Sequence, residues 1–74
     1  MLTLIQRDDC ALCDEAWEVL HQAGVRDFDA LFIDGDAELE MRYGASVPVL
    51  RSGRRELSWP FDADRIKAWL GQSA

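Results

Sequence analysis

Short blocks of apolar residues along the chain predict an alternation of strands and helices. Residues 2–5 and 28–33 are short, largely apolar runs, which is typical of strands in the core of a sheet. Residues 47–51 and 54–58 are two further blocks on either side of Ser52-Gly53, a dipeptide typical of a tight hairpin turn. The pattern therefore predicts four strands.

The stretch after the first strand repeats its apolar residues at helical spacing. Asp8 or Asp9 is expected to cap a helix over residues 11–23, and Gly24 is expected to end it. The apolar stripe of this helix consists of Leu12, Ala16, Val19, Leu20 and Ala23.

Two more helices are predicted between and after the remaining strands. Asp36 is placed to cap a short helix that runs to about Arg42, with Gly44 closing it. Asp62 is placed to cap a last helix that ends at Gly71. The apolar face of this last helix consists of Ile66, Trp69 and Leu70.

The resulting order, β-α-β-α-β-β-α, belongs to the α/β class. The first β-α-β unit implies a parallel strand pair with a right-handed crossover, and the hairpin adds antiparallel strands. Helices on both sides of a four-stranded mixed sheet would complete a three-layer α/β/α sandwich. We expect residues 1–74 to form one small domain.

Composition and charge narrow the classes of function. The chain has 74 residues, 49% of them hydrophobic, and a net charge of −6, which argues against a nucleic-acid partner because such binding needs a basic face. No apolar stretch approaches the roughly 20 residues of a membrane span. Arg7, Asp8 and Asp9 interrupt the first apolar run as they would not in a signal peptide, so we expect a cytoplasmic protein. In that compartment, cysteines are more often catalytic or metal-binding than structural.

Cys10 and Cys13 are the candidates for chemistry. Their two-residue spacer at the start of a predicted helix puts both sulfurs within one turn, where they can close a disulfide or reopen to a dithiol. The helix start and Arg7 would lower the pKa of the Cys10 thiol. Nearby acids oppose this, so we expect a modest lowering; they are Asp8, Asp9, Asp14 and Glu15. The alternative is an inert buried cysteine pair.

Metal binding is a weaker interpretation of the same cysteines. Two thiolates leave a zinc site two ligands short. His21, the single histidine, lies about 12 Å along the same helix from Cys13 at ~1.5 Å per residue, too far to join it. Asp34 and Asp36 do not belong to a full cation-binding loop. Within one chain we therefore expect no metal site, and only a zinc ion or cluster shared by two chains stays open.

Three segments carry a resemblance to a known family. They are residues 7–13 (RDDCALC), residues 42–48 (RYGASVP) and the acidic cap Asp62. With the predicted element order, they make the chain similar to the glutaredoxin-like form of the thioredoxin fold. Most of all, the chain resembles the small bacterial glutaredoxin-like proteins of the DUF836 type, in which Tyr-Gly precedes Val-Pro-Val-Leu. The resemblance covers nearly the whole chain.

The resemblance implies roles for four redox-site residues. Cys10 matches the nucleophilic cysteine and Cys13 the resolving cysteine. Pro48 matches the proline that is cis in this fold, and Val47 matches the residue whose backbone pairs with a thiol-bearing peptide or glutathione. From composition alone, a trans proline at the start of a strand would be expected, since only about 5–6% of X-Pro bonds are cis.

The resemblance also implies two substrate contacts. Arg7 stands where glutaredoxins often carry a basic residue for a glutathione carboxylate, and Asp62 lies near the γ-glutamyl site. Two departures from the family pattern count against glutathione. Leu12 replaces an aromatic residue before the second cysteine, and Ser58-Trp59 aligns with a Gly-Gly pair.

The sequence thus predicts a thiol–disulfide oxidoreductase. It would need no cofactor beyond its disulfide, with glutathione as a candidate co-substrate, and would act as a monomer on a protein or low-molecular-weight disulfide. The alternative is a non-catalytic thioredoxin-like binding module with structural cysteines. Positive charge on the hairpin either steers an acidic partner or keeps an edge strand soluble, and it comes from Arg51, Arg54 and Arg55.

Overall fold

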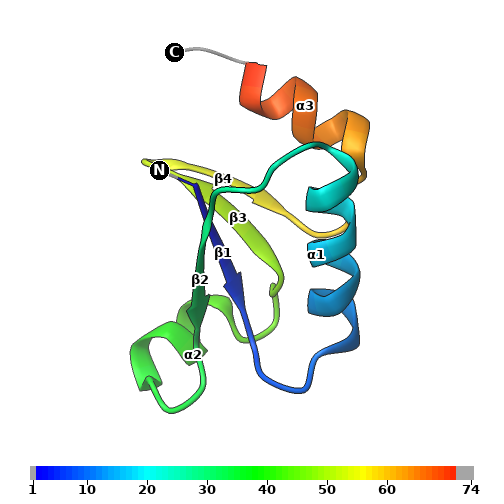
Figure 1. Cartoon of the computed structure of the whole chain (residues 1–74). Helices are drawn as coiled ribbons and strands as arrows, with labels where there is room; N and C mark the ends of the chain where they lie inside the picture. The colour runs from blue at the N-terminus through cyan, green and yellow to red at the C-terminus, as the bar shows by residue number, and fades with distance from the viewer. Residues whose placement is uncertain (1, 72–74) are drawn as a thin grey trace.

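The computed structural model describes residues 2–71 and contains the predicted succession of strands and helices (Figure 1). The strands are β1 (Leu2–Gln6), β2 (Asp29–Phe32), β3 (Val49–Ser52) and β4 (Arg55–Ser58). The helices are α1 (Ala11–Gln22), α2 (Ala37–Tyr43) and α3 (Ala63–Gly71). The order β-α-β-α-β-β-α is therefore confirmed.

The four strands form one mixed sheet in the order β2-β1-β3-β4. β1 pairs in parallel with β2 and antiparallel with β3, and β3 and β4 form the antiparallel hairpin. Gly53 supplies the positive φ of 63° that the hairpin turn requires. In the register of the sheet, Leu4 lies opposite Leu50, which lies opposite Leu57. This row crosses three strands.

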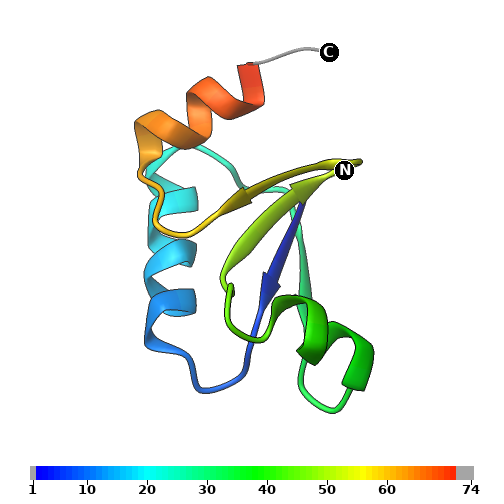
Figure 2. The same ribbon diagram turned by 180° about the vertical axis from the view of Figure 1, so that it is seen from behind.

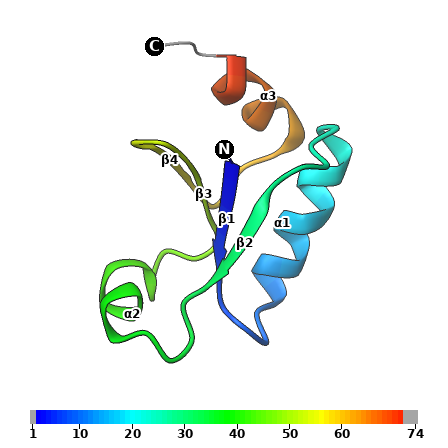
Figure 3. The same cartoon turned by 60° about the vertical axis from the view of Figure 1, so that its left-hand side comes forward.

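Successive residues of β1 face opposite sides of the sheet and so divide the core in two. Leu4 and Leu50 pack with residues of α1 and α3, such as Leu20 and Ile66. Ile5 packs on the other side in a separate cluster. That second cluster consists of Ile5, Ile33, Tyr43 and Val49. Figures 2 and 3 show the result, with α1 and α2 on opposite sides of the sheet and α3 at its upper end. The expected three layers are confirmed.

Side chains of two predicted caps hold the starts of their helices. The Asp36 carboxylate accepts a hydrogen bond from the Leu39 amide at 3.1 Å at the start of α2. The Asp62 carboxylate accepts one from the Arg65 amide at 2.7 Å at the start of α3. The predicted Asp8 or Asp9 cap of α1 is wrong, because Cys10 is the N-cap residue.

Two residues of the predicted apolar helix faces are exposed in the structure, Leu12 in α1 and Leu70 in α3. Leu12 is 45% exposed, and the buried side of α1 runs through Cys13, Ala16 and Leu20. At about 100° per residue, Leu12 lies at the margin of that stripe. Leu70 is 42% exposed at the corresponding margin of α3. Along residues 2–71, no helix has the length and apolar character that a membrane crossing requires.

Candidate active site

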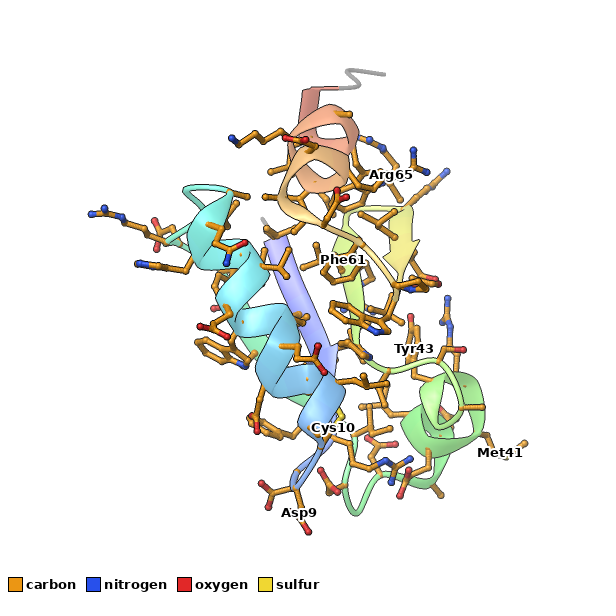
Figure 4. The ribbon with its side chains drawn as sticks, turned by 90° about the vertical axis from the view of Figure 1, so that its right-hand side faces the viewer. Asp9, Cys10, Met41, Tyr43, Phe61 and Arg65 are labelled. Carbon is orange, nitrogen blue, oxygen red and sulfur yellow. A yellow bond between two sulfur atoms is a disulfide. The ribbon has the colours of Figure 1, made fainter. Side chains whose placement is uncertain are left out.

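Cys10 and Cys13 form a disulfide at the start of α1. Cys10 has an extended backbone (φ −125°, ψ 111°) and caps the helix, while Cys13 lies in its first turn. Their Cα atoms are 5.2 Å apart, within the usual range for a disulfide. Cys13 is 1% exposed and Cys10 is partly exposed, so an attacking group reaches Cys10 first. Figure 4 shows Cys10 just before the first turn of α1.

The start of α1 directs backbone amides at the Cys10 sulfur. The Cys13 N–H donates a hydrogen bond to Cys10 Sγ at 3.1 Å. Cys10 also belongs to the helix through its carbonyl, which accepts from the Asp14 N–H at 3.1 Å. Amides at a helix start are unpaired within the helix and carry the positive end of its dipole. Such amides stabilise negative charge placed at the start of a helix.

The loop before Cys10 is fixed by a contact with the end of β2. The Asp8 N–H donates to the Asp34 carboxylate at 2.8 Å. Asp9 adopts a positive φ of 53°, a conformation that Asp tolerates better than most residues, and its side chain points away from the helix (Figure 4). The acidic side chains expected around Cys10 are all exposed, and they are Asp8, Asp9, Asp14 and Glu15.

Pro48 lies at the same end of the sheet as the disulfide loop. Ile5 pairs with Val49, so the register places Pro48 beside the last residue of β1, from which the chain leads to Cys10. The Val47-Pro48 peptide bond is cis, as the resemblance implied. Pro48 is buried, and its carbonyl accepts from the Trp59 N–H at 3.1 Å. The Val47 N–H donates to the Tyr43 carbonyl at 3.0 Å and is therefore already engaged within the chain.

Arg7 ties the end of β1 to α2. Its guanidinium lies 2.6 Å from the Glu40 carboxylate and donates to the Gly44 carbonyl at 3.2 Å. Gly44 is needed where α2 ends, because a Cβ atom there would clash with the Glu40 carbonyl oxygen. Asp62, the other predicted substrate contact, is engaged as the cap of α3. Both residues thus have structural partners.

A buried glutamine beside α1 was missed by the sequence analysis. Gln6 is 3% exposed, and its side-chain carbonyl accepts from the Trp17 indole N–H at 2.9 Å. Trp17 also packs on Phe28, with ring centroids 4.9 Å apart, and stays 45% exposed. The signal available in the sequence was a polar residue that continues the alternation of Leu2 and Leu4. Gln6 and Trp17 fix the first half of α1 on the sheet.

The aromatic residues before α3 pack as a pair. Phe61 is buried in the cluster under α3, and Trp59 packs against the same cluster. Their rings meet edge to face with centroids 4.9 Å apart. Trp59, the residue directly after β4, therefore contributes to the core.

No group of three or more metal-ligating side chains occurs among the residues that the structure describes. His21 lies in the last turn of α1, at the opposite end of that helix from the cysteines. The site itself consists of the two sulfurs and the backbone around them.

The comparison with known proteins agrees with this geometry. Residues 1–71 match the family model of the glutaredoxin-like domain (DUF836). The chain belongs to this glutaredoxin-like family. Its mixed four-stranded sheet with three helices is a thioredoxin-like fold. None of the curated proteins is a significant match.

Two solved structures are closely similar to this member of the glutaredoxin-like family. The X-ray structure of the structural genomics target protein XcR50 from X. campestris is 60% identical, with a TM-score of 0.90 and 95% of each chain covered. The solution structure of XcR50 is 61% identical, with a TM-score of 0.87, covering 93% of this chain and 90% of that one.

Proposed function

We propose that this glutaredoxin-like protein is a thiol–disulfide oxidoreductase in which Cys10 attacks and Cys13 resolves. The observation that carries the proposal is the asymmetry of the pair at the start of α1. Cys10 is partly exposed and receives an amide hydrogen bond, whereas Cys13 is buried one turn further on. A nucleophile needs access and a stabilised thiolate, and a resolving thiol needs only to reach its neighbour.

The proposed reaction passes two electrons from the dithiol to a substrate disulfide. The Cys10 thiolate attacks one substrate sulfur, a mixed disulfide forms, and the other substrate sulfur leaves as a thiolate that takes up a proton. The Cys13 thiol loses its proton and attacks Cys10 Sγ. The Cys10–Cys13 disulfide forms, and the second substrate thiolate is released and protonated. A reductant must then return the pair to the dithiol.

Val47 and Pro48 are proposed to hold the backbone of the substrate next to Cys10. Their place beside the end of β1 supports this role. Because the Val47 N–H already donates to Tyr43, a substrate would pair with the Val47 carbonyl unless that hydrogen bond opens. The substrate is a protein or low-molecular-weight disulfide, and we place the reaction in the cytoplasm, where reductants keep dithiols available.

Glutathione is a proposed co-substrate. Arg7 would bind one of its carboxylates and Asp62 its γ-glutamyl amino group. Each residue already has a partner, Glu40 for Arg7 and the Arg65 amide for Asp62, so glutathione would have to compete with both.

The first experiment is a redox titration of the Cys10–Cys13 pair. The protein is equilibrated in graded dithiothreitol buffers, its free thiols are alkylated, and the products are weighed. The proposal expects a reversible two-electron couple between roughly −270 and −180 mV. A pair that never oxidises, or that stays closed below about −300 mV, would favour the binding-module alternative.

Two single variants assign the roles of the sulfurs. Cys10→Ser should abolish reduction of a disulfide substrate, because the sulfur that remains, that of Cys13, is buried and out of reach of the substrate. Cys13→Ser should retain the first step and accumulate a mixed disulfide at Cys10, visible by mass. If Cys10→Ser keeps full turnover, Cys10 is not the nucleophile.

A further inference from the structure

A positively lined hollow lies on the α2 side of the sheet, away from the disulfide. It has a volume of about 630 Å³, a size typical of small-molecule sites. Its lining comes from β1, α2, β3, β4 and the hairpin turn, and consists of Thr3, Arg42, Arg51, Gly53, Arg54 and Glu56. Three of these six residues are arginines, in a chain with a net charge of −6.

The register of the sheet explains how the hollow forms. Thr3 pairs with Arg51, and Arg51 pairs with Glu56, so the three side chains stand in one row on one face. α2 packs on this face through Tyr43, against Ile5 and its neighbours. Figure 2 shows the β3–β4 hairpin extending away from α2, and α2 reaches this row through Arg42 and Tyr43, which lie next to Glu56.

The one acid of the hollow is already engaged. The Glu56 carboxylate accepts from the Tyr43 hydroxyl and lies 3.9 Å from the Arg42 guanidinium. For Arg51 and Arg54, the structure gives no ion pair with any residue of the 2–71 range. Two guanidinium groups therefore face the hollow without a negative partner from that range.

The third hairpin arginine is used elsewhere. Arg55 lies on the other face of β4, where its guanidinium donates to the Trp69 carbonyl and stacks 5.0 Å from the Trp69 ring centroid. If the hairpin arginines served only to keep the edge strand soluble, Arg51 and Arg54 would not need to line the same hollow as Arg42. The division of the hairpin charge between the two faces thus points to a ligand for the hollow.

We propose that this hollow binds the phosphate groups of a small multiply phosphorylated anion. Guanidinium groups match phosphate oxygens with paired hydrogen bonds, and the Thr3 hydroxyl adds a further donor. Among residues 2–71, no aromatic side chain lines the hollow, so it offers no aromatic ring for a nucleobase to stack on. Recognition is accordingly of the phosphates, whether they come from inorganic polyphosphate or from an organic phosphate.

This site is independent of the redox proposal. Thr3 precedes the last residue of β1 by three positions, about 10 Å of strand, and the cysteines follow beyond that end. A ligand in the hollow would therefore not touch the disulfide, and loss of either site leaves the other testable.

The test is calorimetric titration of the full chain with inorganic tripolyphosphate at low salt. Arg51→Gln/Arg54→Gln should bind at least about tenfold more weakly, because the two unpaired guanidinium groups are removed. The matched control is Arg26→Gln/Arg65→Gln, which removes the same charge from exposed positions outside the hollow and should stay within about twofold. An equal loss in both double variants, or no binding by the parent protein, overturns the proposal.

A second variant and a second readout keep the test clear of folding effects. Glu56→Gln keeps an acceptor for the Tyr43 hydroxyl and removes the opposing charge, so it should tighten tripolyphosphate binding severalfold. Amide NMR shifts on titration should concentrate at Thr3 and Gly53. Shifts concentrated at the start of α1 instead would overturn the assignment.

Adenosine triphosphate in a parallel titration identifies an organic source if it binds more tightly than tripolyphosphate, and an inorganic source if it does not.

Discussion

At the scale of single residues, Cys10 has two roles. It is the N-cap of α1, with its sulfur accepting the Cys13 N–H, and it is the exposed half of the disulfide. Aspartate caps are common, which is why the sequence favoured Asp8 or Asp9 for the cap. Serine is also a good N-cap, so Cys10→Ser should remove the chemistry and leave the helix intact.

Arg7 offers a residue-scale prediction about glutathione. If Arg7 is mainly a structural tie to α2, Arg7→Gln and Glu40→Gln should each lower the free energy of unfolding by about 1 kcal/mol or less, because the ion pair is partly exposed. If Arg7 also binds a glutathione carboxylate, as proposed, Arg7→Gln should reduce glutathione disulfide severalfold more slowly, whereas Glu40→Gln should keep the parental rate. Urea unfolding and a turnover assay provide the two measurements.

Glu40→Gln is the control for this interpretation of Arg7, because it breaks the same ion pair without touching the guanidinium. A rate that falls severalfold in Arg7→Gln and not in Glu40→Gln would show that Arg7 contacts glutathione. If the two variants are equally stable but Arg7→Gln reduces glutathione disulfide more slowly than Glu40→Gln, the conclusion is the same.

At the scale of elements, α3 provides a matched pair of substitutions. Ile66 is fully buried between the helix and the sheet, and Leu70 is 42% exposed one turn later. Ile66→Ala should lower the free energy of unfolding by about 2–5 kcal/mol, through lost burial and the cavity left behind. Leu70→Ala should cost well under about 1 kcal/mol, as surface substitutions usually do.

Chemical denaturation of both variants measures the difference between these positions. Similar losses for Ile66→Ala and Leu70→Ala would mean that α3 is rotated relative to the sheet. The sequence alone placed both residues on one face, so this comparison tests what the structure adds.

Periodicity in the sequence was enough to predict every strand and helix, since apolar spacing depends only on local geometry. It failed at the margins of the helical stripes, at Leu12 and Leu70, because exposure there depends on how far each helix overlaps the sheet. The arginine hollow could not be predicted from the sequence, because it too depends on how the elements pack together. Arg42 and Arg51 come together only through strand register and the docking of α2.

At the scale of the whole molecule, the sheet keeps two regions of different chemistry apart. The end at which β1 finishes carries the disulfide and the Val47-Pro48 loop, and the hairpin end carries the arginine hollow. Two clusters of apolar side chains, one on each side of the sheet, support both ends. A domain this small has a modest stability, so a change of about one or two kcal/mol is a large fraction of it.

The oxidation state of the Cys10–Cys13 pair should have a limited effect on the free energy of unfolding. The cysteines are three residues apart, and closing such a short ring removes little freedom from the unfolded chain, about 2 kcal/mol in the chain-entropy account. We expect the free energy of unfolding of the oxidised protein to exceed that of the reduced protein by no more than this amount. Guanidinium unfolding with and without dithiothreitol measures it, and Cys10→Ser/Cys13→Ser, which cannot form the bond, should not respond.

This limit links stability to function through the redox couple. A difference of about 2 kcal/mol lowers the reduction potential by only about 40 mV, which leaves the pair within the range of known oxidoreductases. A difference above about 4 kcal/mol would lower it by more than about 80 mV and hold the disulfide closed. The cysteines would then act as a structural staple, and the non-catalytic binding module would be the better account of this protein.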